Sequence, residues 1–201
     1  MAKGPRYCVP FRRRREGKTD YKARKALLLS SKPRLVTRTS LRNTSVQVIA
    51  AKPYGDEVIA SAHSSKLVKN CGWKATTGNI PTAYLTGLLC GLEAREKGIK
   101  AAILDVGLHS PTKNGRIFAA LKGVLDAGVD ISHSETRLPD EHSIEGKHIA
   151  EYAEILTTHG EEYQIRFSKY LERILPPEKL PTHFAETKKK IILLYGGGKK
   201  S

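Results

Sequence analysis

The spacing of apolar residues predicts no regular element at the start of the chain. Residues 1–20 follow neither the helical nor the strand period, and two prolines within them oppose a helix. The successive arginines Arg12–Arg15 would repel one another on any compact surface. We therefore expect a segment that is disordered in the free protein. One or two helical turns are expected next, over 21–29, before Pro33.

The pattern then changes to one that is typical of β-strands. Three segments are rich in Val, Ile, Thr and Ser, and they cover residues 34–41, 44–51 and 57–63. The breaks between them are short, and Asn43 and Gly55 are residues that favour tight turns. Successive strands joined by short turns pair in antiparallel fashion, so the sequence predicts a three-stranded antiparallel meander.

Helical and strand patterns alternate over the next part of the chain. The leucines of 81–97 recur at the spacing i, i+3, i+4 and i+7, and Gly87 and Gly91 lie one turn apart on the same helix. That glycine spacing indicates a closely approaching neighbour. Three further elements follow: a buried strand over 100–106, a helix over 114–127 and a short strand over 129–131. Strand–helix–strand units of this length imply parallel crossovers, so the fold class is α/β with a mixed sheet.

Residues 135–175 have a different character, because acidic residues outnumber basic ones and apolar stripes recur at helical spacing. Gly160 separates two stripes, and Pro176-Pro177 ends the second. They predict an amphipathic helical pair that packs on the sheet domain or on a partner. The stripe residues are Ile149, Tyr152, Ala153 and Leu156, then Tyr163, Phe167, Tyr170, Leu171 and Ile174.

The chain is expected to have three parts. A basic arm covers 1–33, and a mixed α/β sheet domain covers 34–134. An acidic helical extension with a basic tail covers 135–201, and the tail from 188 onward combines a basic run, an apolar run and a Gly-rich end.

Charge strengthens this division. The chain has 201 residues, 39% of them apolar, and a formal net charge of +15. Residues 1–42 alone carry 14 basic and 2 acidic side chains, a net charge of +12. No apolar run approaches the roughly 18 residues of a membrane span, and none has the pattern of a signal peptide. These features exclude an integral membrane protein and do not favour secretion. A basic arm on a nearly neutral body is typical of a protein that binds a polyanion.

Motifs that would support catalysis are incomplete. Gly17-Lys18-Thr19 matches only the end of a phosphate-binding loop, since Arg12 stands where that motif needs glycine. A magnesium-dependent nuclease needs clustered carboxylates. The candidates for such a cluster are Glu93, Asp105, Asp126 and Asp130. None lies on the opening strand, and no cysteine or histidine spacing fits a zinc site or a catalytic triad. We therefore expect no cofactor, no metal and no catalytic residue.

The arm combines positive charge with aromatic rings. Tyr7, Phe11 and Tyr21 alternate with lysines and arginines, and a tail that serves only solubility has no use for such rings. Arginine pairs with phosphate through two hydrogen bonds, and both arginine and aromatic rings stack on bases. Unpaired bases of RNA loops suit such an arm better than duplex DNA does. From these residues alone we interpret the chain as a small α/β domain with an RNA-binding arm.

Four segments resemble a known family of ribosomal proteins. They are VPFRRRREGKTDY at 9–21 with Pro5-Arg6-Tyr7 before it, NIPTAYLTGLL at 79–89, FAALKGVLDAG at 118–128 and KHIA at 147–150. The family is large-subunit ribosomal protein eighteen of archaeal type, whose eukaryotic relative is ribosomal protein five of the large subunit. The resemblance spans residues 3 to about 175.

The resemblance implies a structural constituent of the cytoplasmic large ribosomal subunit, and not an enzyme. Members bind 5S rRNA in the central protuberance and also touch the large rRNA. The expected partners are these RNAs and neighbouring large-subunit ribosomal proteins, with no membrane and no small-molecule substrate. The implied fold is a ribonuclease-H-like mixed sheet without the carboxylates of the nuclease. The alternatives are a general RNA-binding protein and an RNA-processing protein with that fold.

The resemblance and the charge of the arm together indicate the residues that contact RNA. Arg38, Arg42 and Asn43 are candidates at the sheet edge, and Lys74 is a candidate in a loop. The arm candidates are Lys3, Arg6, Tyr7, Phe11, Arg12, Arg13, Arg14, Arg15, Lys18, Thr19, Tyr21, Lys22, Arg24 and Lys25.

Overall fold

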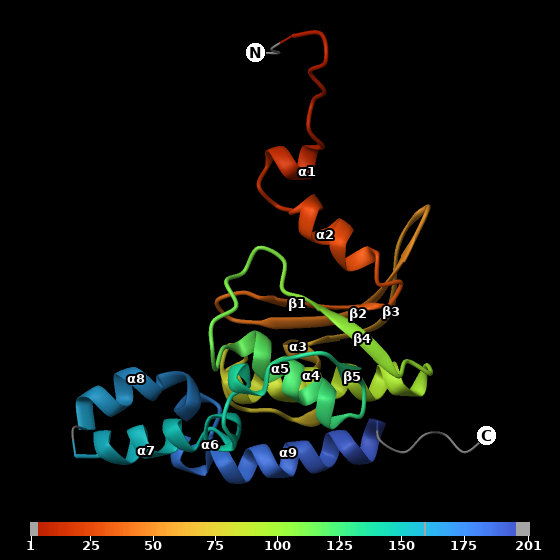
Figure 1. The fold of residues 1–201 in the computed structure, drawn as a ribbon. Helices are drawn as coiled ribbons and strands as arrows, with labels where there is room; N and C mark the ends of the chain where they lie inside the picture. Colours follow the sequence, from red (N-terminus) through yellow and green to blue (C-terminus); the bar gives the residue numbers. More distant parts are fainter. Residues whose placement is uncertain (1–3, 159, 196–201) are drawn as a thin grey trace.

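The computed structural model describes residues 4–158 and 160–195, which form a mixed α/β fold (Figure 1). Its five-stranded sheet has the order β3-β2-β1-β4-β5. The β1–β2 and β2–β3 pairs are antiparallel, whereas the β1–β4 and β4–β5 pairs are parallel. The strands are β1 (Arg34–Thr39), β2 (Thr44–Lys52), β3 (Gly55–His63), β4 (Ala101–Asp105) and β5 (Asp130–Ile131). The predicted meander and the parallel crossovers after it are both confirmed.

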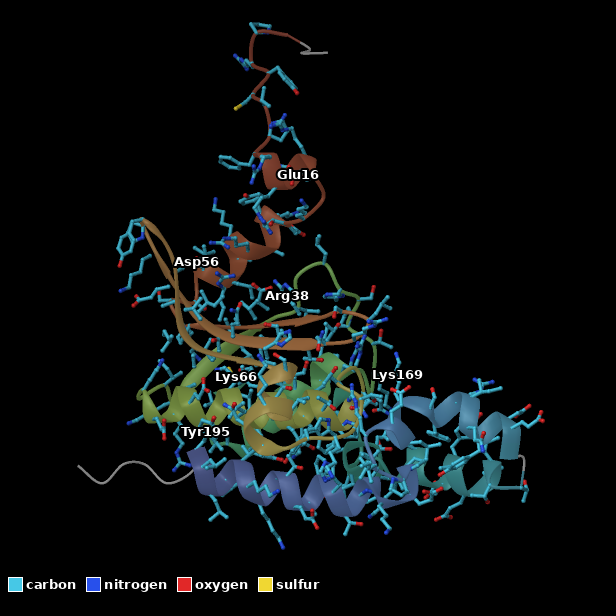
Figure 2. The ribbon with its side chains drawn as sticks, turned by 180° about the vertical axis from the view of Figure 1, so that it is seen from behind. Glu16, Arg38, Asp56, Lys66, Lys169 and Tyr195 are labelled. Atoms are coloured by element: carbon cyan, nitrogen blue, oxygen red, sulfur yellow. The ribbon has the colours of Figure 1, made fainter. Side chains whose placement is uncertain are left out.

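Side chains of β1 alternate between the two faces of the sheet. Leu35 lies in the hydrophobic core beside its register partner Val48 of β2. Because side chains alternate along a strand, Arg34 and Arg38 point to the opposite face. Helices cover the face of Leu35, and the N-terminal arm stands on the side of the two arginines (Figures 1 and 2). The covering helices are α3 (Ser64–Cys71), α4 (Ile80–Glu96) and α5 (Arg116–Asp126).

Glycines allow α4 and α5 to touch through their backbones. A Cβ atom at Gly87 would lie 2.0 Å from the carbonyl oxygen of Ala120, and one at Gly123 would lie 2.2 Å from that of Tyr84. Gly91 also faces α5 and would bring a Cβ within 3.2 Å of its backbone. The close approach that Gly87 and Gly91 predict is therefore confirmed.

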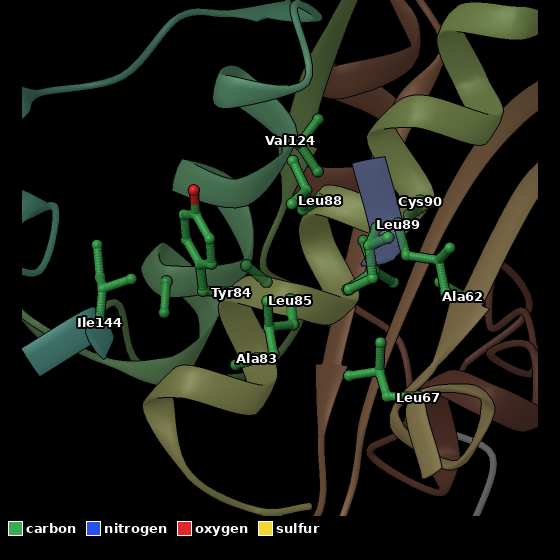
Figure 3. Packing of buried hydrophobic residues seen from close by; sticks show 14 of the residues in the cluster. Ala62, Leu67, Ala83, Tyr84, Leu85, Leu88, Leu89, Cys90, Val124 and Ile144 are labelled. Carbon is green, nitrogen blue, oxygen red and sulfur yellow. The ribbon is translucent and has the colours of Figure 1, made fainter. Parts of the chain in front are cut away.

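The core lies around α4, which is buried along most of its length. Cys90 of α4 lies beside Ala62 of β3, whereas Leu88 turns toward Val124 of α5 (Figure 3). Burial raises the pKa of the Cys90 thiol to about 12, so this thiol stays protonated at neutral pH. A helix that is apolar on every side is typical of a central position between layers.

The acidic region folds as the predicted helical pair, but three residues of the predicted apolar stripes are exposed, namely Tyr152, Leu171 and Ile174. The expected helical pair corresponds to α7 (Lys147–Leu156) and α8 (Gly160–Glu172), which follow the short α6 (Glu141–Glu145). The rings of Tyr152 and Tyr163 both pack near the ring of Phe167. Their centroids lie 6.2 Å and 5.4 Å, respectively, from the centroid of Phe167. Ile174 does not belong to the stripe, because α8 ends before it and its side chain is 83% exposed.

Helices α3 and α9 (Leu180–Tyr195) are not among the predicted elements, and α9 adds a further layer beneath α4 (Figure 1). The buried residues of α9 are Leu180, Phe184, Thr187 and Ile191. Their spacing is helical, but Pro181 and the basic run at 188–190 conceal it in the sequence. A proline in the first turn is compatible with a helix, since its missing N–H has no partner there. Residues 196–201 of the predicted tail lie outside the described residues.

His183 joins α9 to the loop before α4. Its ring stacks on Trp73 with centroids 5.0 Å apart, and its Nε2 accepts a hydrogen bond of 3.1 Å from the backbone N–H of Lys74. Burial, assisted by the charges of Lys190 and Lys74, lowers the pKa of His183, although Glu186 acts in the opposite direction. An acceptor nitrogen must be unprotonated, so the contact and the lowered pKa agree.

The Gly87→Ala variant is expected to lose about 1–3 kcal/mol of stability, because the added methyl forces α4 and α5 apart. Gly160→Ala is the control, since a Cβ atom there meets nothing within 4 Å. The control should unfold at the same urea concentration as the parent or slightly above it. Urea denaturation followed by circular dichroism measures both, and equal stabilities of the two variants would contradict this account of the crossing.

Stability should also fall in mild acid because of His183. The unfolded chain takes up a proton on this residue near the ordinary pKa of about 6.5, whereas the folded chain does so only at lower pH. The unfolded state therefore binds more protons there, so this contribution is complete above the ordinary pKa and declines below it. Free energies of unfolding measured from about pH 8 to pH 5 should show the decline. The variant His183→Gln should show a smaller decline in the free energy of unfolding. If its free energy of unfolding depends on pH as that of the parent does, His183 is not the cause of the decline.

Candidate nucleic-acid interface

The N-terminal arm, residues 4–33, projects away from the sheet on the side opposite to α4 and α5 (Figure 1). It contains the single helical turn α1 (Arg12–Arg15), which the sequence did not predict, and the expected helix α2 (Tyr21–Leu28). Neither helix has a buried residue. The arm carries ten basic and two acidic side chains. It therefore presents its charge to the surroundings and not to the body.

Contacts within the arm explain its local structure. Asp20 caps α2, and its side chain accepts hydrogen bonds from two backbone N–H groups of the first turn. Arg13 Nε donates to Thr19 Oγ1 at 2.9 Å, and the rings of Phe11 and Tyr21 lie 5.1 Å apart. These two contacts join the turn α1 to the start of α2. Four predicted RNA contacts thus also hold the arm in shape, namely Phe11, Arg13, Thr19 and Tyr21.

Some cations of the arm form ion pairs within the protein, and others do not. Arg12 and Lys18 both lie near Glu16, at 3.7 and 2.9 Å, on the exposed surface. Arg24 pairs with Asp56 at the start of β3, at 2.8 Å. Within residues 4–158 and 160–195, no ion pair involves Arg6, Arg13, Arg14, Arg15, Lys22 or Lys25. These six cations, together with Lys32, which is also in no ion pair of the described residues, are the ones most available to an external anion.

Two arginines of β1 share one carboxylate beneath the arm. Arg34 Nη1 lies 2.7 Å from Asp105 Oδ2, and Arg38 Nη2 lies 3.0 Å from Asp105 Oδ1. Arg34 also reaches Asp56 at 2.9 Å and is 3% exposed, whereas the side chain of Arg38 is 43% exposed. Arg38, a predicted RNA contact, therefore has an internal partner and still borders the surface on the arm side (Figure 2).

The other predicted contacts are not gathered around the arm. Asn43 accepts a hydrogen bond from Ser64 within the body, and the backbone of Lys74 contacts α9 at the far side of the helical layer. Arg42 is exposed at the β1–β2 turn. Lys3 lies outside the described residues. RNA contact by all of these residues stays a prediction.

The carboxylates that a nuclease would need are separated and paired with other groups. Both oxygens of Asp105 face arginines, and Asp126 accepts a hydrogen bond of 2.6 Å from the hydroxyl of Tyr84. Glu93 lies 3.3 Å from Lys66. In the described part of the chain, no three His, Cys, Asp or Glu side chains converge as a metal site would require.

Sequence reasoning missed two features on the side of the arm. Asp56 bridges the arm to the sheet, but an acidic residue in a hairpin turn carries no signal of such a role. The loop between β4 and α5 rises beside the arm (Figure 1) and bounds an open polar cavity of about 290 Å³. The cavity is lined by Thr39, His109, Ser110, Thr112, Gly115, Arg116, Ile117 and Phe118.

A mixed α/β body with an exposed basic arm is the design of a polyanion-binding protein. A family model described as ribosomal large subunit proteins 60S L5 and 50S L18 matches residues 5–100 and 92–134 of this chain. The two matches together span more than half of the 201 residues. The chain therefore belongs to this family of RNA-binding proteins of the large ribosomal subunit. Among the helices of residues 4–158 and 160–195, none combines the length and the apolar character that crossing a membrane requires.

The Asp105→Asn variant is expected to lose about 1–3 kcal/mol of stability, because the buried Arg34 loses one of its two carboxylates and keeps only Asp56. Asp130→Asn is the control, since Asp130 is exposed on a short edge strand. Thermal or urea unfolding measures both variants. RNA incubated with magnesium should stay intact with parent and variant alike, and cleavage that disappears with Asp105→Asn would instead support a nuclease.

Proposed function

We propose that the chain is a non-enzymatic structural component of the large ribosomal subunit that binds 5S rRNA. In this proposal it anchors 5S rRNA to the large rRNA in the central protuberance. The family supports the ribosomal part of the proposal, and the arm supports the RNA-binding part. The observation that carries it is an exposed helical turn made only of arginines, on an arm that stands clear of the body.

The geometry of α1 indicates how the arm meets RNA. Successive residues of a helix point about 100° apart, so Arg12–Arg15 point in all directions around the turn. No single flat surface can receive all four guanidinium groups. We infer that the arm inserts between RNA segments, whose phosphates surround it, and does not lie on one RNA surface. RNA phosphates then supply the negative charge that the arm itself lacks.

The fold supports the absence of catalysis in this proposal. The strand order β3-β2-β1-β4-β5, with three antiparallel strands followed by two parallel ones, is consistent with a ribonuclease-H-like sheet. A nuclease of this fold would need a carboxylate on β1. This strand has no acidic residue and carries Arg34 and Arg38 on one face instead. We therefore propose that the sheet serves as a support for the arm.

Replacing Arg12–Arg15 by alanine should weaken 5S rRNA binding and reduce its dependence on salt. Each phosphate contact contributes roughly 0.7–0.9 to the log–log salt slope, so the slope should fall by about two to four units. The matched control removes four exposed lysines of the body, namely Lys69, Lys100, Lys179 and Lys189. Fluorescence anisotropy with labelled 5S rRNA at several salt concentrations measures both variants. Equal slopes for the two variants would show that the arm has no special role.

The same assay separates the proposal from its alternatives. Tyr7→Ala should cost about 1–3 kcal/mol with little change in slope if this ring stacks on a base. Deletion of residues 1–25 should leave a cooperatively folding body that binds 5S rRNA weakly. Equal affinity for 5S rRNA, unrelated RNA and duplex DNA would favour a general nucleic-acid-binding protein instead.

A further inference from the structure

Burial of apolar side chains holds the arm only weakly, because Leu27 and Leu28 of α2 are no more than half-buried. No residue of α2 is buried, and the side chain of Leu29 that follows it is 78% exposed. An arm attached only through its peptide backbone would sample many directions relative to the sheet. A specific polar contact would therefore add to the two half-buried leucines in holding α2 in its observed position.

An unbroken chain of ion pairs joins α2 to the centre of the sheet. Arg24 Nη2 lies 2.8 Å from Asp56 Oδ1, and Arg34 Nη2 lies 2.9 Å from Asp56 Oδ2. Arg34 Nη1 then lies 2.7 Å from Asp105 Oδ2, and Arg38 Nη2 lies 3.0 Å from Asp105 Oδ1. We call these five residues the ion-pair chain. Figure 2 shows Asp56 on the β2–β3 hairpin beside α2, with Arg38 below the arm.

Burial increases along the ion-pair chain from Arg24 to Arg34 and decreases again at Arg38, which borders the surface. The side chain of Arg24 is 32% exposed, that of Asp56 is 28% exposed and that of Arg34 is 3% exposed. Arg34 is held from both sides, by Asp56 and by Asp105, so its guanidinium group has little freedom. It fixes one oxygen of Asp56, and the other oxygen of that carboxylate then faces Arg24. A carboxylate that is fixed by a buried partner can hold a more exposed arginine in one place.

We propose that Asp56 is a positioning residue that fixes the direction of the RNA-binding arm. This inference rests on the proposed function, because it concerns how the arm is presented to RNA. Partial burial raises the pKa of Asp56, but the hydrogen bond and charge of Arg24 and the charge of Arg34 outweigh it, so that the pKa is lowered overall. Asp56 is therefore ionised at neutral pH and holds Arg24 through a charge-assisted hydrogen bond.

The proposal can be tested by the direction in which RNA affinity changes when the acidic side chain of Asp56 is removed. Removal of an acidic residue from an RNA-binding protein should strengthen binding if only overall charge matters. Removal of a positioning residue should weaken binding, because the arm is then presented in many directions. Asp56→Asn and Glu57→Gln each remove one negative charge from neighbouring positions of β3. Glu57 pairs with Lys52 on the exposed hairpin, away from the ion-pair chain, so Glu57→Gln is a matched control.

The first measurement is affinity for 5S rRNA at one fixed salt concentration. We expect Asp56→Asn to weaken binding by roughly two- to fivefold, the factor that corresponds to a partly exposed ion pair. Glu57→Gln should bind as the parent does or slightly more tightly. If Asp56→Asn binds as tightly as Glu57→Gln, Asp56 does not position the arm. If the chain that lacks residues 1–25 binds 5S rRNA as tightly as the full chain does, the proposed function itself is wrong.

The second measurement reports the direction of the arm without RNA. Cys8 lies exposed in the arm, whereas Cys71 and Cys90 are buried at 3% and 0% exposure, so a nitroxide reagent distinguishes them. With a second label at Lys69→Cys on the body, double electron–electron resonance gives the arm-to-body distance distribution. Asp56→Asn should broaden it, and Glu57→Gln should not.

The variant Arg24→Gln shows whether an effect of Asp56→Asn comes from the arm or from a loss of folding. It breaks the arm's side of the pair and leaves the buried contacts of Arg34 with Asp56 and Asp105 in place. It should broaden the distance distribution as Asp56→Asn does, with a thermal unfolding midpoint close to that of the parent. Distributions of parental width in both variants would overturn the proposal.

Discussion

A guanidinium group buried near the centre of the sheet links the parts of this protein. Arg34 is the first residue of β1, and its two terminal nitrogens bind carboxylates from β3 and β4. A charge that is withdrawn from water is tolerated only where its partners satisfy it. The hairpin β2–β3 and the parallel strand β4 must therefore meet β1 in one particular geometry. Since Arg34 directly follows the arm, the same contacts define where the arm leaves the body.

The body and the arm meet opposite physical demands. In the body, α4 is apolar on nearly all sides, and glycines bring it into backbone contact with α5, so the packing tolerates little change. In the arm, the neighbouring cationic side chains repel one another. No side chain of α1 or α2 is buried. Such an arm gains little stability from apolar burial, and its ion pair with the body joins Arg24 to Asp56. The division explains how one chain combines a fixed scaffold with a strongly charged binding element.

The C-terminal helices extend the scaffold away from the arm. Helix α9 packs beneath α4 and is held by His183 on Trp73, while α7 and α8 form a separate aromatic cluster around Phe167 (Figure 1). These helices follow residue 134, where the family match ends. Acidic residues outnumber basic ones in residues 135–175, which include α7 and α8, whereas α9 carries the basic run 188–190. The largest local excess of positive charge lies in the arm, on the other side of the sheet from α9.

The sequence by itself determined the antiparallel meander, the two helices of the crossovers, the glycine contact and the charge of the arm. Each of these leaves a local signal, such as the Val, Ile, Thr and Ser content of the first three strands, the leucine spacing of α4 or the run Arg12–Arg15. The tertiary structure alone decided the pairing of charges, because Arg34 and Asp105 lie 71 residues apart and periodicity carries no information on partners at that separation. It also decided that α9 is a helix, since its apolar face is interrupted by Thr187 and becomes stable only against α4.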